Sequence, residues 1–308
     1  MIATQSSTAI KRAVPDKRRW SDVRLHLAYG ILLVCITAFT WKLLQSLLEL
    51  SMYDQSSSHL LLIPFVSIFL VVVDRDRIFA ETRPLIGAGA LCVAAGSLAY
   101  WWLARQTLVA GTWSLSGASL AEIVIWVGGF IFCYGSKAAR SAAFPLLFLL
   151  LMIPLPAPIL TRVVHFLQQG STDMAYMLFK LVGTPVLRQG FVLALPGVTI
   201  RVAEECSSIR SSIALVITCL LAGHFWLRRA RHVLLLLLAA AVFSVVKNGI
   251  RIAALVLLSI YVDPRFLTGS LHRDGGFVFF FLALAMVWPV LSFLQRREAC
   301  DPQLVRER

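Results

Sequence analysis

Long runs of apolar residues alternate with short polar and basic stretches along the whole chain. Several runs approach the roughly 20 residues that a helix needs to cross a bilayer. The pattern therefore predicts an all-α integral membrane protein with about eight transmembrane helices. The expected spans lie at about 25–46, 60–73, 85–104, 118–135, 141–158, 205–227, 233–262 and 277–294.

Two parts of this pattern are irregular. The seventh run, 233–262, is too long for one straight crossing and too short for a helical hairpin, so we expect one helix that is bent or interrupted at "KNG". Between the fifth and sixth spans, "ILTRVVHFLQQGSTDMAYMLFKLVG" predicts a helix in the interface plane or a re-entrant helix. The next segment, "TPVLRQGFVLALPGVTIRV", predicts a small, outward-facing, irregular or hairpin-like cap.

Composition agrees with a membrane protein. Of 308 residues, 58% are hydrophobic and only 15% are charged, and the mean hydropathy is +0.79. Soluble globular domains rarely reach such values. The first apolar run lacks a small-residue cleavage site, so we expect it to be retained as the first span. The predicted organisation is a cytoplasmic basic tail at 1–24, a multi-pass membrane domain at 25–294 and a cytoplasmic tail at 295–308.

The net charge of +13 comes from short basic clusters between apolar runs. Such clusters indicate membrane topology and not nucleic-acid binding, which would need one basic arm or stripe. The positive-inside rule then places both termini in the cytoplasm. The basic residues on that side are Lys11, Arg12, Lys17, Arg18, Arg19, Arg75, Arg77, Arg83, Lys137, Arg140, Arg228, Arg229, Arg231, Arg296 and Arg297.

The segment "VAEECSSIRSS" places Cys206 at the outer end of the sixth span. No other cysteine falls on that side, so a disulfide is not expected. A helix N-terminus, with Arg210 one turn further on, favours a reactive thiolate. Ser207 would help to solvate it. Glu204 and Glu205 either raise the pKa of the thiol or stabilise the first helical turn, and a cysteine that simply packs at the membrane is the alternative.

Two further groups are candidates for the same side of the membrane. Within "FSVVKNGIRIAAL", Asn248 and Arg251 are three residues apart and share a helix face. An ionisable residue inside a span suggests function, although Lys247 and Arg251 snorkelling to the interface is an alternative. His272, in the loop before the eighth span, suits proton transfer.

Other histidines are weaker candidates for proton transfer. His165, on the outer amphipathic stretch, is the substitute for His272. His59, in "YDQSSSHLLLIPF", lies where an interfacial anchor is expected.

These residues resemble the exosortases and the related archaeosortases, which are multi-pass cysteine transpeptidases. The resemblance rests on "YDQSSSHLLLIPFVSIFLVVVDR", "EECSSIRS", "NGIRI" and "LHRDGG". It implies that Cys206 is the nucleophile, Arg251 the essential arginine and His272 the third catalytic member. The residue pattern itself adds Arg210, Asn248 and Ser207 as supporting residues. The histidine in "LHRDGG" resembles the one found at this position in the bacterial exosortase branch. The "CSS" of this chain differs from the "CSG" of many family members.

The resemblance implies an enzyme of the bacterial plasma membrane with its site facing outward. It would cleave the C-terminal sorting signal of exported proteins, namely a short PEP-type motif, a transmembrane helix and a basic tail. A thioester intermediate would then be transferred to an unknown surface acceptor. The expected partners are these proteins and the lipid bilayer, with no nucleic acid.

No cofactor or metal is expected, because no zinc-type ligand spacing is present. Three other functions are considered: a multi-pass transporter, a non-catalytic component of polysaccharide export, and proteolysis by water.

Overall fold

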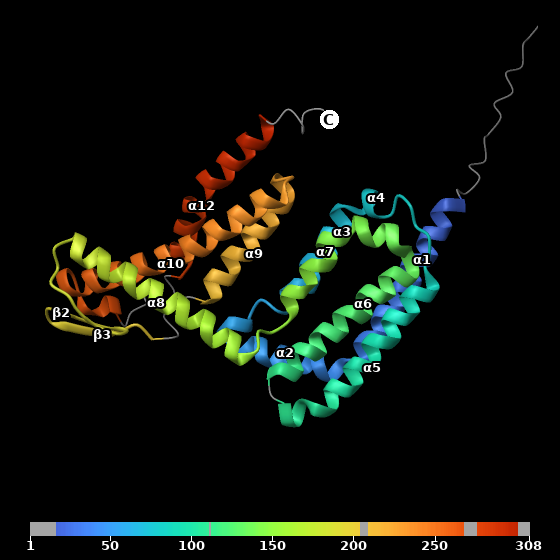
Figure 1. Cartoon of the computed structure of the whole chain (residues 1–308), viewed down its shortest axis with the longest axis horizontal. Coiled ribbons are helices and arrows are strands. Elements are labelled where there is room, and N and C mark those ends of the chain that lie inside the picture. The colour runs from blue at the N-terminus through green and yellow to red at the C-terminus, as the bar shows by residue number, and fades with distance from the viewer. Residues whose placement is uncertain (1–16, 111, 204–208, 268–275, 301–308) are drawn as a thin grey trace, which may run out of the picture. The chain divides into compact units, whose positions relative to one another are not determined.

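The computed structural model describes residues 17–110, 112–203, 209–267 and 276–300. Most of these residues are helical, in the order labelled in Figure 1. The long helices are α1 (Lys17–Phe39), α2 (Trp41–Tyr53), α3 (Leu62–Val73), α5 (Ile86–Ala110), α6 (Thr112–Ser141), α8 (Ala157–Leu181), α9 (Ile209–Trp226), α10 (Ala230–Tyr261) and α12 (Gly276–Ala299). The short helices are η1 (Gln55–Ser57), α4 (Arg75–Ile78), α7 (Ala143–Phe148), η2 (Leu149–Met152) and η4 (Pro264–Leu267).

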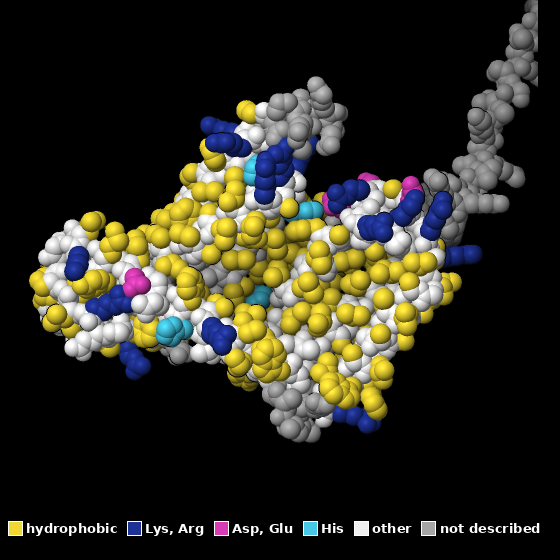
Figure 2. Space-filling view, viewed as in Figure 1, with side chains coloured by type: hydrophobic (Ala, Val, Ile, Leu, Met, Phe, Trp, Pro, Cys, Tyr) yellow, Lys and Arg dark blue, Asp and Glu magenta, His cyan; other side chains and the backbone are white. Residues whose placement is uncertain are grey.

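Within the described residues, five helices are long and apolar enough to cross a membrane, and up to seven spans result if each bent helix pair counts as one. The bent pairs are Val23–Phe39 with Trp41–Tyr53, at 74°, and Ala143–Met152 with Ala157–Leu181, at 91°. All eight predicted segments contain helix, but Leu62–Val73 is a shorter one. The all-α membrane class is therefore confirmed, and the number of eight spans stays a prediction. Figure 2 shows apolar side chains along the helices and Lys and Arg near helix ends.

The chain forms two compact units. Unit 1 comprises Met1–Gln45, Pro64–Ala110 and Gly117–Leu150, and unit 2 comprises Ser46–Ile63, Gly111–Ser116 and Leu151–Arg308. An aromatic cluster forms part of the core of unit 1, where Tyr29, Phe79 and Phe130 surround Tyr134. His26 hydrogen-bonds with the Tyr134 hydroxyl at 2.8 Å.

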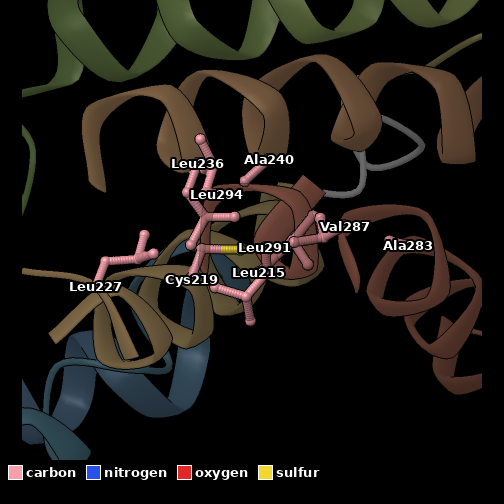
Figure 3. Close-up of a cluster of buried hydrophobic side chains, with 9 residues drawn as sticks. All are labelled: Leu215, Cys219, Leu227, Leu236, Ala240, Ala283, Val287, Leu291 and Leu294. Carbon is pink, nitrogen blue, oxygen red and sulfur yellow. The ribbon is translucent and has the colours of Figure 1, made fainter. Parts of the chain in front are cut away.

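Helices α9, α10 and α12 form one core of unit 2 around small and aliphatic side chains. Figure 3 shows Cys219 among leucines from these helices, which is the packing role that most membrane cysteines have. The buried residues of this core are Leu215, Cys219, Leu227, Leu236, Ala240, Ala283, Val287, Leu291 and Leu294.

Helix α10 is a single helix of 32 residues. The expectation of one helix is confirmed, but the interruption predicted at Lys247, Asn248 and Gly249 is wrong, because all three residues are helical. At 1.5 Å per residue the helix is about 48 Å long, which exceeds the roughly 30 Å hydrocarbon core. The extra length allows one end of α10 to extend beyond the membrane.

A small antiparallel sheet follows α8 where the sequence predicts a hairpin-like cap. Its strands are β1 (Leu187–Gln189), β2 (Val192–Leu195) and β3 (Val198–Arg201), in the order β1-β2-β3. The two turns use Gly190 and Gly197 at positive φ, 60° and 78°, which glycine adopts without a steric cost. Leu193 and Leu195 pack with residues of α8 and α10. The strands are therefore part of unit 2, and their outward orientation stays a prediction.

Candidate functional site

The predicted site residues divide into two groups. Cys206, Ser207 and His272 lie outside the described residues. Arg210, Asn248 and Arg251 belong to helices of unit 2: Arg210 is the second residue of α9, and the other two lie on α10. The structure therefore tests the surroundings of the arginines and Asn248, whereas the roles of Cys206 and His272 remain expectations.

Asn248 connects α10 to α8. It is 1% exposed, and its Nδ2 donates a hydrogen bond of 2.9 Å to Ser171 Oγ, which is fully buried. Glycines allow the two helices to approach closely here. A Cβ added to Gly249 would lie 2.5 Å from Met174 Cβ, and one added to Gly170 would lie 2.8 Å from Val245 Cγ1. The polar contact therefore lies inside a tight helix–helix interface.

Lys247 connects α10 to α9. Its side chain is 2% exposed and its Nζ donates a hydrogen bond to Ser211 Oγ, in the first turn of α9. The alternative that Lys247 snorkels to the interface is therefore wrong, because its ammonium group is enclosed by the bundle. No carboxylate in the described part of the chain forms an ion pair with this lysine.

Arg251 lies one helical turn after Lys247 on the same side of α10 and is half-buried. Ser244, one turn before Lys247, is 2% exposed, and its Oγ has no hydrogen-bond partner among the described residues. We call this group the polar seam: Ser171, Ser211, Ser244, Lys247, Asn248 and Arg251. It brings two cationic side chains and several hydroxyls together where α10 packs against α8 and α9, which is an arrangement suited to negative charge.

The polar seam lies far along α10 from the basic cluster at its start. Arg251 is 21 residues beyond Ala230, hence about 30 Å along the helix, which matches the thickness of the hydrocarbon core. Ser211 is 15 residues before the end of α9, hence about 22 Å from it. If Arg228, Arg229 and Arg231 are cytoplasmic, the seam lies near the opposite surface of the membrane.

Helix α8 also holds the chain that leads toward Cys206. Gln168 is 5% exposed, and its Nε2 donates a 2.5 Å hydrogen bond to the carbonyl oxygen of Val202. Thr172 Oγ1 donates to the Gln168 carbonyl at 2.8 Å, and an ion pair between Asp173 and Arg188 joins α8 to β1. The segment "VAEEC" thus begins from a fixed residue, four positions before the predicted nucleophile.

The outer histidines differ in their surroundings. His165 is exposed, and its ring packs edge-on against Phe191 at a centroid distance of 5.2 Å. His59 is half-buried in a loop whose η1 turn packs against α9. Burial lowers the pKa of His59, and hydrogen bonds with the backbone of Leu151 and Ser56 and the charge of Asp54 only partly offset this effect.

Asp54 is a well-bonded carboxylate in the same loop. Burial tends to raise its pKa, but the hydroxyls of Ser56 and Ser57 and the backbone of Ser56 donate to it and lower the pKa on balance. The described residues contain no group of three or more His, Cys, Asp or Glu that could hold a metal ion.

Sequence reasoning missed the residues of α8 that belong to the site. The signal was available in "FLQQGSTD", because Gln168, Ser171 and Thr172 recur at helical spacing on one face and are all buried. The polar interruptions predicted a helix in the interface plane or a re-entrant helix, but they did not reveal that Ser171 on this face contacts α10 through Asn248.

A family model described as transmembrane exosortase matches residues 41–289 of the chain. The match covers all of the helices that carry the polar seam and most of both units. Comparisons with curated proteins and with solved structures found no match. The chain therefore belongs to the transmembrane exosortase family.

Proposed function

We propose that this protein is a membrane cysteine transpeptidase that processes the C-terminal sorting signals of exported proteins. Membership of the exosortase family supports sorting-signal processing in general. The observation that carries the specific proposal is the polar seam. Its Lys247 contacts the first turn of α9, and α9 begins three residues after Cys206 in the sequence. A buried lysine and a half-buried arginine in one polar seam fit acyl transfer by a thiolate better than simple helix packing.

The proposed reaction has two halves. The Cys206 thiolate attacks the carbonyl carbon of a peptide bond near the substrate's membrane anchor, and the C–N bond breaks to leave a thioester. His272 gives a proton to the leaving amine, then takes one from the acceptor nucleophile as that nucleophile attacks the thioester and the thiolate departs.

Arg251 would stabilise the oxyanion of each tetrahedral intermediate, an effect of about 2.7–4 kcal/mol for a positioned donor. Asn248 would position Arg251 from the adjacent turn. Lys247 would keep the local potential positive without touching the reacting atoms, and Arg210 and Ser207 would favour the thiolate.

The depth of the polar seam supports this assignment. A transmembrane sorting signal presents its cleavable bond just outside the hydrocarbon core, and Arg251 lies about 30 Å from the basic start of α10. A transporter would instead need polar residues along a path through the membrane. The seam is concentrated over two turns of α10, from Ser244 to Arg251, which favours a reaction site over a transport path.

The test is tail removal from a candidate tripartite substrate co-expressed with each variant and followed by gel mobility. Cys206→Ala, Arg251→Ala and His272→Ala should each lose activity by a factor of about 100 or more. Matched controls are Cys35→Ala and Arg265→Ala, since both side chains are exposed. Wild-type rates with Cys206→Ala would reject the nucleophile, and a product with a free new carboxylate would favour hydrolysis over transfer.

A further inference from the structure

Unit 1 contains a buried carboxyl group that the proposed reaction does not use. Glu122 lies on α6 and is 0% exposed. It is ten residues after Thr112, hence about 15 Å into the apolar part of α6 that precedes the kink at Gly135. Ionisable residues at such positions are costly and mark functional sites. No Lys, Arg or His of the described residues forms an ion pair with it.

The polar contacts of Glu122 are few. Its Oε1 lies 2.7 Å from Thr40 Oγ1, whereas its Oε2 is buried and has no hydrogen-bond partner among the described residues. Tyr100, on α5, is the titratable neighbour, and its hydroxyl hydrogen-bonds with the backbone of Leu43. An ionised carboxylate in an apolar interior needs several donors. The surroundings of Glu122 supply one hydroxyl.

The hydroxyl of Thr40 has two acceptors within reach. Thr40 Oγ1 also lies 3.0 Å from the carbonyl oxygen of Ile36, the ordinary acceptor for a helical threonine. A hydroxyl carries one hydrogen and can accept two further bonds. The carbonyl oxygen of Ile36 also accepts the Thr40 backbone N–H at 2.8 Å, so the single hydroxyl hydrogen can go either to Ile36 or to a Glu122 carboxylate. When the hydroxyl donates to Ile36, the carboxyl group must donate to Thr40, and this neutral arrangement also leaves no charge on the unpartnered Oε2.

We propose that Glu122 is a proton-binding site within the membrane. Its carboxyl group holds a proton at neutral pH and donates it to Thr40 Oγ1, while Thr40 donates to Ile36. The neutral form leaves Oε2 as an uncharged carbonyl oxygen, whose burial costs far less than that of a carboxylate. Thr40 lies at the break between α1 and α2. The hydrogen bond from the protonated Glu122 therefore links this break to α6. This site is independent of the chemistry proposed for unit 2.

The test is an infrared difference spectrum of the full chain in liposomes at neutral pH, wild type minus Glu122→Gln. The proposal predicts the carbonyl stretching band of a protonated carboxylic acid. Carboxylate stretching bands in its place would overturn it. Glu49→Gln is the control, because Glu49 is an exposed carboxylate on α2 and its difference spectrum should show carboxylate bands.

A second pair of variants tests the hydrogen bond to Thr40. In Thr40→Val the acid loses its acceptor, so the same band should move to higher frequency. In Thr40→Ser the hydroxyl remains, and the band should keep its wild-type position. A band that does not move in Thr40→Val would contradict the assignment of Thr40 as the acceptor. Both variants retain Glu122, so the band itself reports on the site even if stability changes.

Discussion

Glu122 of unit 1 and Lys247 of unit 2 are both almost completely enclosed by helices, yet their surroundings differ. Glu122 contacts one hydroxyl group, and its second carboxyl oxygen is buried without a partner among the described residues. Lys247 belongs to a seam with a second cation and several polar side chains. An isolated buried acid is best accommodated by a proton, whereas a cluster of cations and hydroxyls is suited to an anionic partner. The contrast supports the proposal that unit 2 carries the chemistry on developing negative charge.

The largest expected effect concerns the helix contact that encloses the polar seam. Gly249→Leu would place side-chain atoms where Met174 already lies, so we expect a loss of about 3 kcal/mol or more in the free energy of unfolding. Gly87→Ala is the control, because nothing lies within 4 Å of its added Cβ, and it should change stability by less than about 1 kcal/mol. Thermal unfolding in detergent measures both. Equal stability of the two variants would show that α8 and α10 do not approach as described.

A second carboxyl group sharpens the contrast between neutral and charged sites. Glu298, at the end of α12, accepts hydrogen bonds from the backbone amides of Arg228 and Arg229, at 2.7 and 3.0 Å, and from His232 Nδ1, at 2.7 Å. These donors favour a carboxylate that caps the start of α10.

Glu298→Gln should therefore cost about 1–3 kcal/mol of stability, since one carboxylate oxygen becomes an amide donor facing other donors. Glu122→Gln should cost almost nothing, because an amide can donate to Thr40 as the protonated acid does. Denaturant unfolding of the two variants gives the comparison. The reverse order would contradict the protonation states assigned to both groups.

Replacing Lys247 separates function from stability. Lys247→Met removes a buried charge but keeps an unbranched side chain, so the thermal midpoint should stay the same or rise. Tail removal should fall about tenfold, which corresponds to about 1.4 kcal/mol of transition-state stabilisation. Lys180→Met, at an exposed position of α8, is the control for both measurements. Wild-type activity of the Lys247→Met variant would show that Lys247 serves packing alone.

The smallest expected effect is the pH dependence of the loop that carries Asp54 and His59. Both pKa values are lower than usual, so the unfolded state binds more protons as pH falls. The stability that His59 contributes is present above its ordinary pKa of about 6.5 and is lost as pH falls through the lowered value. Asp54 adds a similar loss at more acidic pH. Between pH 7 and 5, the free energy of unfolding of His59→Gln should change less with pH than that of the wild type. An unchanged pH profile would contradict the lowered pKa of His59.

Periodicity and composition predicted the helical membrane class, because an apolar run of bilayer length has few alternatives to a helix. The same reasoning placed Asn248 and Arg251 on one face of α10 and anticipated short strands between α8 and α9.

Prediction from the sequence failed for Lys247, because its burial involves Ser211 from another helix. It also failed for the interruption at "KNG", because Gly249 allows a close helix contact and does not break the helix. Glu122 was not recognised, because its partner Thr40 is 82 residues away. Contacts between distant segments are not visible in local patterns.

The most direct test of the contrast between the units is the rate of tail removal by Arg251→Ala and Glu122→Gln, measured side by side with matched expression in the membrane. A loss of about 100-fold or more is expected for Arg251→Ala, because an oxyanion donor is removed. Glu122→Gln should retain the wild-type rate. An active Arg251→Ala protein, or an inactive Glu122→Gln protein that folds normally, would contradict the assignment of the chemistry to unit 2.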